Sequence, residues 1–240
     1  MPVPVDELRT LMAIALSGLL LLLRLDAPRF SGAEYDLEPS AWDEAPPGVS
    51  IGDLAVRAAW PGLAIVLTAG VALLLPAGRG AVGLGASTIL SSATIVWVIV
   101  GCVVGIGAVL GLAAIRVPGW PPRLVLPEAL PRHAFDAVAT AIVDELTFRG
   151  VLLGLLLLAG VPVWIAFLVQ LLVYGIETRL GRYVMTLGLL AEALALGALT
   201  GVLAIATGGV AAPLVVHAVI RFAALDVEGA LPPIVPRRLA

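Results

Sequence analysis

The sequence predicts an all-α fold, a polytopic transmembrane helix bundle of about seven spans. Of the 240 residues, 60% are hydrophobic and 13% are charged, whereas soluble globular domains have about 45–50% apolar and about 25% charged residues. A mean hydropathy of +1.08 leaves too little polar surface to cover a water-soluble globule, so much of the apolar surface must face lipid. The length accommodates about six to eight spans of about 20 residues each.

Apolar segments bounded by proline and glycine define the expected helices. The uncharged stretch 80–115 is open to two interpretations, one long tilted helix or a span followed by a re-entrant piece. The seven expected segments run over residues 8–25, 58–76, 86–115, 132–159, 162–177, 184–206 and 208–225.

Two parts of the chain fall largely outside these segments, an acidic loop over residues 26–57 and a tail over residues 227–240. The loop has Tyr35 and Trp42 among its acidic residues. It is expected either to be a solvated loop with an interfacial helix, its aromatic rings at headgroup level, or to form a lid or a docking surface for a partner. The N-terminal part, residues 1–130, thus combines membrane spans with this loop.

The placement of arginine gives the expected orientation. With seven spans, ten of the 14 basic residues, all of them arginine, fall on one side of the membrane, and only Arg9 and Arg79 fall on the other. The positive-inside rule then predicts a multi-pass protein of the cell (inner) membrane, with its N-terminus outside and its C-terminus cytoplasmic. A net charge of −3 without a basic cluster argues against nucleic-acid binding. The expected partners are membrane lipid and a membrane peptide or protein.

Ionisable residues fall inside the predicted spans, where each would cost at least about 2.5–3.5 kcal/mol on insertion scales. They are expected to face the bundle interior and to pair with one another. A functional role is the default interpretation for such residues, and salt bridges that pin helices together are the alternative. Glu192 has no partner on its own helix and is expected to line a cavity or to pair with Arg221 or Arg179. The six residues are Asp144, Glu145, Arg149, Glu192, His217 and Arg221.

Helix geometry suggests how these residues meet. Glu145 and Arg149 are four residues apart and can form an ion pair on one face, whereas Asp144 is turned about 100° away from Glu145. Asp144 lies about 18 Å along its span from Arg132, near mid-membrane, and His217 lies near the middle of the last span. Asp144 and His217 can therefore meet at one depth. A carboxylate beside an imidazole is suited to general acid–base catalysis on a water molecule.

Two segments carry a family resemblance. Residues 143–150, Val-Asp-Glu-Leu-Thr-Phe-Arg-Gly, resemble the first motif of the CPBP family of intramembrane proteases, which includes CAAX prenyl endoproteases and bacteriocin-processing enzymes. That motif has two glutamates, three residues and an arginine. Residues 207–217, in which a Gly-Gly turn and an Ala-Pro pair precede His217, are similar to the family's last motif. The resemblance covers about 130–225 and implies a CPBP-like core over residues 131–226.

The resemblance also implies roles for the site residues. The position of the family's general base, which acts on a water, is occupied by Asp144. Glu145 and Arg149 match the supporting pair, and His217 matches an imidazole that holds the water or a metal. Arg221 stands where the family has an asparagine that helps to form the oxyanion site.

The chain departs from the family pattern at three places. Asp144 is shorter than glutamate, which moves its carboxylate by about 1 Å, and such a displacement can cost roughly 100-fold in rate. The middle motif, an aromatic residue followed four residues later by histidine, begins here with Tyr174, and either Thr178 or, after a one-residue slip, Glu177 replaces the histidine. Arg221 can stabilise an oxyanion or neutralise Asp144.

No metal or other cofactor is expected. A catalytic zinc site normally has three protein ligands. The plausible ligands here are Asp144, Glu177 and His217, and the charge of Arg221 would repel a cation.

Two functions are consistent with these residues. The first is a CPBP-type intramembrane endopeptidase that acts on a membrane-associated or lipidated peptide, with proteolysis impaired by the altered motifs. The second is a catalytically inactive scaffold or partner-binding subunit that keeps the protease fold. The second function predicts that Arg221 contacts Asp144 or Glu192.

Overall fold

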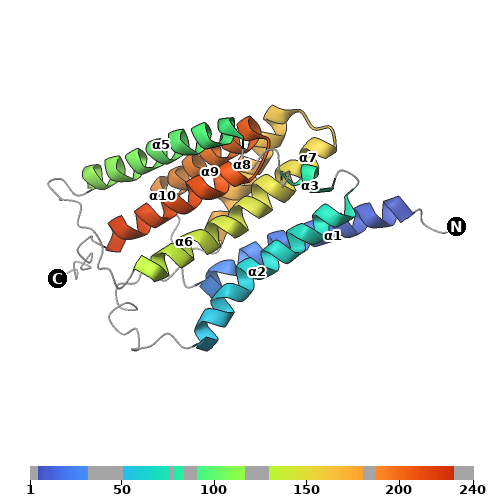
Figure 1. The fold of residues 1–240 in the computed structure, drawn as a ribbon, viewed down its shortest axis with the longest axis horizontal. Helices are drawn as coiled ribbons and strands as arrows, with labels where there is room; N and C mark the ends of the chain where they lie inside the picture. Colours follow the sequence, from blue (N-terminus) through green and yellow to red (C-terminus); the bar gives the residue numbers. More distant parts are fainter. Residues whose placement is uncertain are drawn as a thin grey trace.

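The computed structural model describes six stretches of the chain, drawn as ribbons in Figure 1. Within these stretches every regular element is a helix and there is no strand, as the hydrophobic pattern predicts. The described stretches are residues 5–31, 51–75, 78–83, 91–116, 130–180 and 187–229.

Each of the seven predicted segments corresponds to helical structure, with its ends displaced by a few residues. The fourth segment is the least regular, because it contains a π-helical stretch, η3, between two α-helices. Within the ambiguous stretch 80–115, the residues from Ser92 onward form one continuous helix. The elements are α1 (Val5–Ser31), α2 (Ile51–Leu74), α3 (Gly78–Ala81), α5 (Ser92–Arg116), α6 (Leu130–Asp144), η3 (Glu145–Leu152), α7 (Leu153–Leu158), α8 (Val163–Leu180), α9 (Leu187–Thr207) and α10 (Ala211–Gly229).

The acidic loop is shorter than the range 26–57 predicts. Helix α1 continues to Ser31 and α2 begins at Ile51, so helix occupies both ends of the expected loop. Residues 32–50, with most of the acidic side chains, and residues 230–240 of the expected tail lie outside the described residues.

The helices run roughly along one direction, with α6 and η3 in the middle of the bundle (Figure 1). Helices α1 and α2 pack together on one side of this central segment, whereas α8, α9 and α10 pack on the other side, and α5 lies against α10. Helix α1 begins at one end of the bundle and α10 ends at the opposite end. The central segment therefore contacts helices from both halves of the chain.

The inward face of α1 follows helical periodicity. Ala13, Ser17, Leu20 and Arg24 are spaced four, three and four residues apart, and all four are buried. Ala13 and Leu20 belong to a core cluster with residues of α2 and α6, including Val71. The stripe brings the far end of α1, with Arg24, to the centre of the molecule.

The outward faces are strongly apolar. Within the described residues, two helical stretches are long and apolar enough to cross a membrane, Ser92–Leu112 with hydropathy 2.7 and Leu190–Thr207 with hydropathy 1.8. Only 11% of the first stretch is buried inside the protein. Its residues Val103 and Ile99 are more than half exposed, at 68% and 58%. An apolar helix with this exposure supports a membrane location.

Two GxxxG pairs lie on α5, Gly101 with Gly105 and Gly107 with Gly111, and such pairs allow helix backbones to approach closely. A Cβ atom at Gly101 would lie 2.8 Å from Cγ2 of Val216, and one at Gly105 would overlap the side chain of Ile220. A Cβ atom at Gly107 would meet nothing within 4 Å. The first GxxxG pair thus belongs to the interface that holds the His217 helix in place.

Candidate functional site

The two carboxylates of the site lie where α6 meets the π-helical segment η3, because Asp144 ends α6 and Glu145 begins η3. The backbone N–H of Leu153 donates to the carbonyl oxygens of Phe148, five residues earlier, and of Gly150. Such π-helical turns are rare and are frequent at functional sites. Residues 143–151 are buried without interruption, because α1, α2, α8 and α9 all pack against η3.

A short turn fixes the ends of the two motif segments. Val82 is buried, and its carbonyl oxygen lies where a Cβ atom on Gly150 would come within 3.3 Å. The N–H of Val210 donates to the carbonyl oxygen of Gly83 at 3.2 Å. Gly83 has a positive φ of 68°, and a Cβ atom there would come within 3.0 Å of Gly209. Small residues in both motifs therefore let this turn join η3 to the start of α10.

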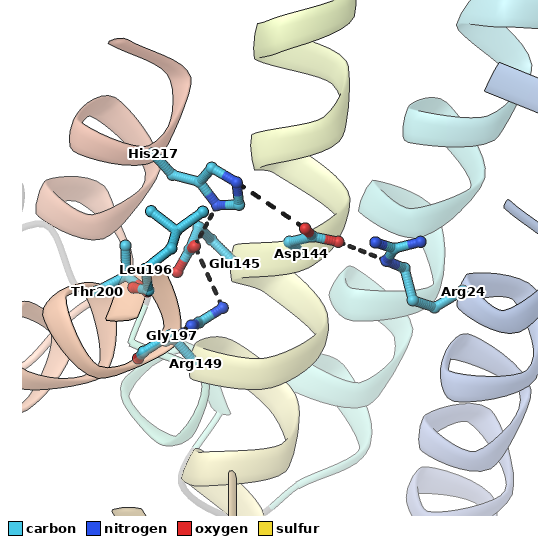
Figure 2. Close-up of polar contacts among 8 residues, drawn as sticks. All are labelled: Arg24, Asp144, Glu145, Arg149, Leu196, Gly197, Thr200 and His217. Atoms are coloured by element: carbon cyan, nitrogen blue, oxygen red, sulfur yellow. Dashed lines mark hydrogen bonds and ion pairs between the residues drawn. The ribbon is translucent and has the colours of Figure 1, made fainter. Parts of the chain in front are cut away.

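The adjacent acids Asp144 and Glu145 face different partners (Figure 2). Asp144 Oδ1 accepts a hydrogen bond from Arg24 Nε at 2.5 Å, across 120 residues of sequence. Glu145 Oε1 lies 3.2 Å from an Nη1 atom of Arg149 on the same helix, which is the ion pair that the spacing predicts. Both acids are almost fully buried. Each carboxylate charge is thus neutralised by its own arginine.

His217 lies between the two acids (Figure 2). Its Nδ1 atom is 2.6 Å from Glu145 Oε1, whereas its Nε2 atom is 3.9 Å from Asp144 Oδ2. The contact with Asp144 that the helix depths predict is therefore present, although the hydrogen bond goes to Glu145. When Nδ1 carries the proton and donates to Glu145, Nε2 keeps a lone pair on the side of Asp144.

The 3.9 Å separation between His217 Nε2 and Asp144 Oδ2 is too long for a direct hydrogen bond. By distance alone, one water at about 2.8 Å from each atom would bridge this separation with an angle at the water of about 90°. The pair has the geometry to hold one water between a carboxylate and an imidazole.

Arg149 connects three helices. Its Nη2 atom donates to the carbonyl oxygen of Gly197 on α9 at 3.2 Å. Its guanidinium carbon lies 4.4 Å from the ring centroid of Tyr174 on α8, and Tyr174 makes an edge contact with Phe148 at 5.0 Å. Arg149 therefore joins η3 to α8 and α9.

The middle motif contributes Glu177 to the site. Glu177 is 8% exposed and interacts electrostatically with Arg24 and Asp144. Neither of its carboxylate oxygens has a hydrogen-bond partner within the described part of the chain. The side chain of Thr178, the other residue proposed for this position, lies outside the described residues.

The arginine on Asp144 is Arg24 and not Arg221. Arg221 lies half-buried on α10, four residues after His217, and Glu192 lies half-buried on α9. The described residues include no ion pair between Arg221 and Asp144.

Arg24 is the site residue that the sequence reasoning missed. The arginine distribution places it among the ten arginines of the expected cytoplasmic side, whereas it is 9% exposed and contacts Asp144. Its guanidinium carbon also lies 6.0 Å from the ring centroid of Trp60 on α2. The signal that identifies it is its place on the buried stripe of α1, in register with Ala13, Ser17 and Leu20.

Among the residues that the structure describes, no group of three or more histidine, cysteine, aspartate and glutamate side chains is placed to hold a metal ion.

Comparison with known proteins identifies one family. Residues 127–223 match the family model described as Rce1-like, type II CAAX prenyl endopeptidase Rce1-like. The match spans the two motif segments and α6 to α10, whereas α1, with Arg24, lies outside it. No curated protein matches the chain, and no solved structure does.

Proposed function

Residues 127–223 belong to the CPBP family, and on this premise we propose that the chain is a CPBP-type intramembrane peptide hydrolase whose activity is attenuated. One observation carries this proposal. Asp144 lies within reach of His217 across a gap that fits a water, yet its charge is engaged by Arg24 at 2.5 Å.

In the proposed reaction Asp144 acts as the general base. A water between Asp144 and His217 gives a proton to the carboxylate as its oxygen attacks the carbonyl carbon of a peptide bond. The C–N bond then breaks, and the proton passes to the leaving amine. Glu145 and Arg149 orient His217, and Arg221 is the proposed cation for the oxyanion.

Attenuation follows from two features of Asp144. Its shorter side chain places the carboxylate farther from its target than glutamate would. In addition, the ion pair with Arg24 stabilises the negative charge of Asp144, and a stabilised carboxylate is a weaker base toward water. Both features weaken the step that depends on base placement.

The proposed substrate is a membrane-associated or lipidated peptide. The family description names a CAAX prenyl endopeptidase, and the polar site lies among helices with strongly apolar outward faces. A peptide held at the membrane by a lipid group would reach such a site without leaving the bilayer surface.

The proposed topology has seven spans, with the N-terminus outside and the C-terminus cytoplasmic. It rests on the distribution of arginine along the sequence. The opposite positions of the start of α1 and the end of α10 in Figure 1 fit an odd number of crossings.

The test is hydrolysis of a prenylated CAAX peptide by the purified protein in lipid nanodiscs, with the released C-terminal fragment detected by mass spectrometry. We expect slow release by the wild type and none by Asp144→Ala or His217→Ala, while all three proteins bind the peptide. Wild-type release that persists in both variants would show that these residues do not carry the reaction.

The scaffold function is the second candidate, and the ion pairs that engage both acids favour it. Asp144 is paired with Arg24, and Glu145 is paired with Arg149 and His217. A wild-type protein that binds the peptide with no turnover above that of Asp144→Ala would establish this function instead.

A further inference from the structure

We infer that Arg24 is a positioning residue shared by two acids. It holds Asp144 in an ion pair in the resting site, and it moves to Glu177 when Asp144 turns to the water beside His217. The inference rests on the proposed role of Asp144 as the base. The position of Asp144 would then depend on α1, which lies outside the matched residues 127–223.

The first support is the contact between Arg24 and Asp144. The hydrogen bond from Arg24 Nε to Asp144 Oδ1 is 2.5 Å long, and the two side chains are only 10% and 3% exposed. The bond uses one of the five N–H donors of the guanidinium group. Because those donors form a planar fork, the same group can serve a second carboxylate.

The second support is Glu177, which is suited to receive Arg24. Its carboxylate is 8% exposed, it attracts Arg24 and repels Asp144 electrostatically, and its two oxygens have no hydrogen-bond partner among the described residues. A buried carboxylate without partners is costly. A cation within electrostatic range can therefore be drawn to it.

The third support is the balance of charge. The arginines that interact with the three acids Asp144, Glu145 and Glu177 in the described residues are Arg24 and Arg149. Glu145 is paired with Arg149, which is fixed by Gly197 and Tyr174. Asp144 and Glu177 are thus left to compete for Arg24.

Thermal unfolding in detergent micelles tests this sharing without any enzymatic readout. In the wild-type background Glu177→Gln changes the Tm little, because Arg24 pairs with Asp144. In an Asp144→Asn background Arg24 has Glu177 as its remaining acid, so Glu177→Gln lowers the Tm by at least about 4 °C. The shift vanishes when Arg24→Gln is added. Arg9→Gln, which removes an exposed arginine from the same helix, is the matched control.

Equal Tm shifts for Glu177→Gln in all three backgrounds would overturn the inference, since Glu177 would then not depend on Arg24. This result is independent of hydrolysis. The expected Tm pattern in a protein without turnover would refute the proposed function and leave the sharing of Arg24 in place.

The kinetic readout separates positioning from direct catalysis. Without Glu177, Arg24 stays on Asp144, so Glu177→Gln lowers kcat at least about tenfold with little change in KM. In an Arg24→Gln background the same substitution has no further effect on kcat. A loss of equal size with and without Arg24 would show that Glu177 acts on the substrate itself and would overturn the inference.

Discussion

Two arginines hold the acids of the site in different ways. Arg149 sits one helical turn from Glu145 and also contacts a carbonyl oxygen of α9 and the ring of Tyr174. Arg24 comes from a distant helix, and one carboxylate, Asp144, accepts its hydrogen bond. Arg149 is therefore held by contacts with several helices, whereas the side-chain hydrogen bond of Arg24 goes to one residue, Asp144.

The first prediction concerns Arg149. Arg149→Gln leaves the buried Glu145 without its cation and should cost about 3–5 kcal/mol of stability. Arg149→Lys should recover only part of this loss, because lysine cannot contact Glu145, the Gly197 carbonyl oxygen and the Tyr174 ring together. The measurement is thermal unfolding of the purified variants in micelles.

The control for this prediction is Arg9→Gln at the exposed end of α1, which should change the stability by less than about 0.5 kcal/mol. An unfolding temperature of Arg149→Lys equal to that of the wild type would contradict the structural role of the guanidinium fork.

For single residues, the sequence predicts ion pairs within one helix and misses ion pairs between distant helices. The four-residue spacing of Glu145 and Arg149 indicates their ion pair directly. The partner of Asp144 is 120 residues away, and no periodicity within one helix contains that information. Arg221 was weighed for this place because it lies on the same helix face as His217, whereas tertiary packing brings Arg24 there.

At the scale of elements, the site depends on how α10 is held against its neighbours. Gly101 lets Val216, the residue before His217, approach the backbone of α5. Ile220 lies against Gly105 in the same interface. A change in this interface therefore moves the imidazole relative to Asp144.

The second prediction compares two glycines of α5. Gly101→Ala places a Cβ atom 2.8 Å from Val216 Cγ2, and such overpacking should destabilise the protein by about 1–3 kcal/mol. Gly107→Ala is the matched control, because it makes the same change at a position with nothing within 4 Å. Unfolding temperatures of the two variants check the difference, and equal values would contradict this packing of α5 on α10.

Hydrophobic runs bounded by proline and glycine predict the helices well, since proline removes a backbone donor and glycine raises the entropic cost of a helix. The π-helical form of η3 was not predicted, because residues 145–152 read as an ordinary apolar helix with a local ion pair. The wider turn is stabilised by neighbours on all sides. The choice between Glu177 and Thr178 likewise needs the direction of α8 in the bundle.

At the scale of the whole molecule, an apolar exterior surrounds a buried polar centre. In the part of the chain that the structure describes, two helical stretches meet the length and hydropathy expected of a membrane span, and α1 starts at the end of the bundle opposite to the end of α10. A chain arranged in this way in a bilayer has its two ends on opposite sides.

The third prediction is this opposite placement. With Cys102 replaced by serine, a cysteine at Asp6 should react with a membrane-impermeant maleimide in intact spheroplasts. A cysteine at Ala240 should react only after the membrane is permeabilised. Equal labelling of both positions in intact spheroplasts would contradict an odd number of spans.

The central claim is that Asp144 is the general base of an attenuated hydrolase. The most direct measurement is the rate of prenylated-peptide hydrolysis by Asp144→Glu, with the wild type and Asp144→Ala beside it. Glutamate restores the length of the family's acid, so we expect a rise of roughly 10- to 100-fold over the wild type and no hydrolysis by Asp144→Ala. Equal rates for all three proteins would contradict the claim.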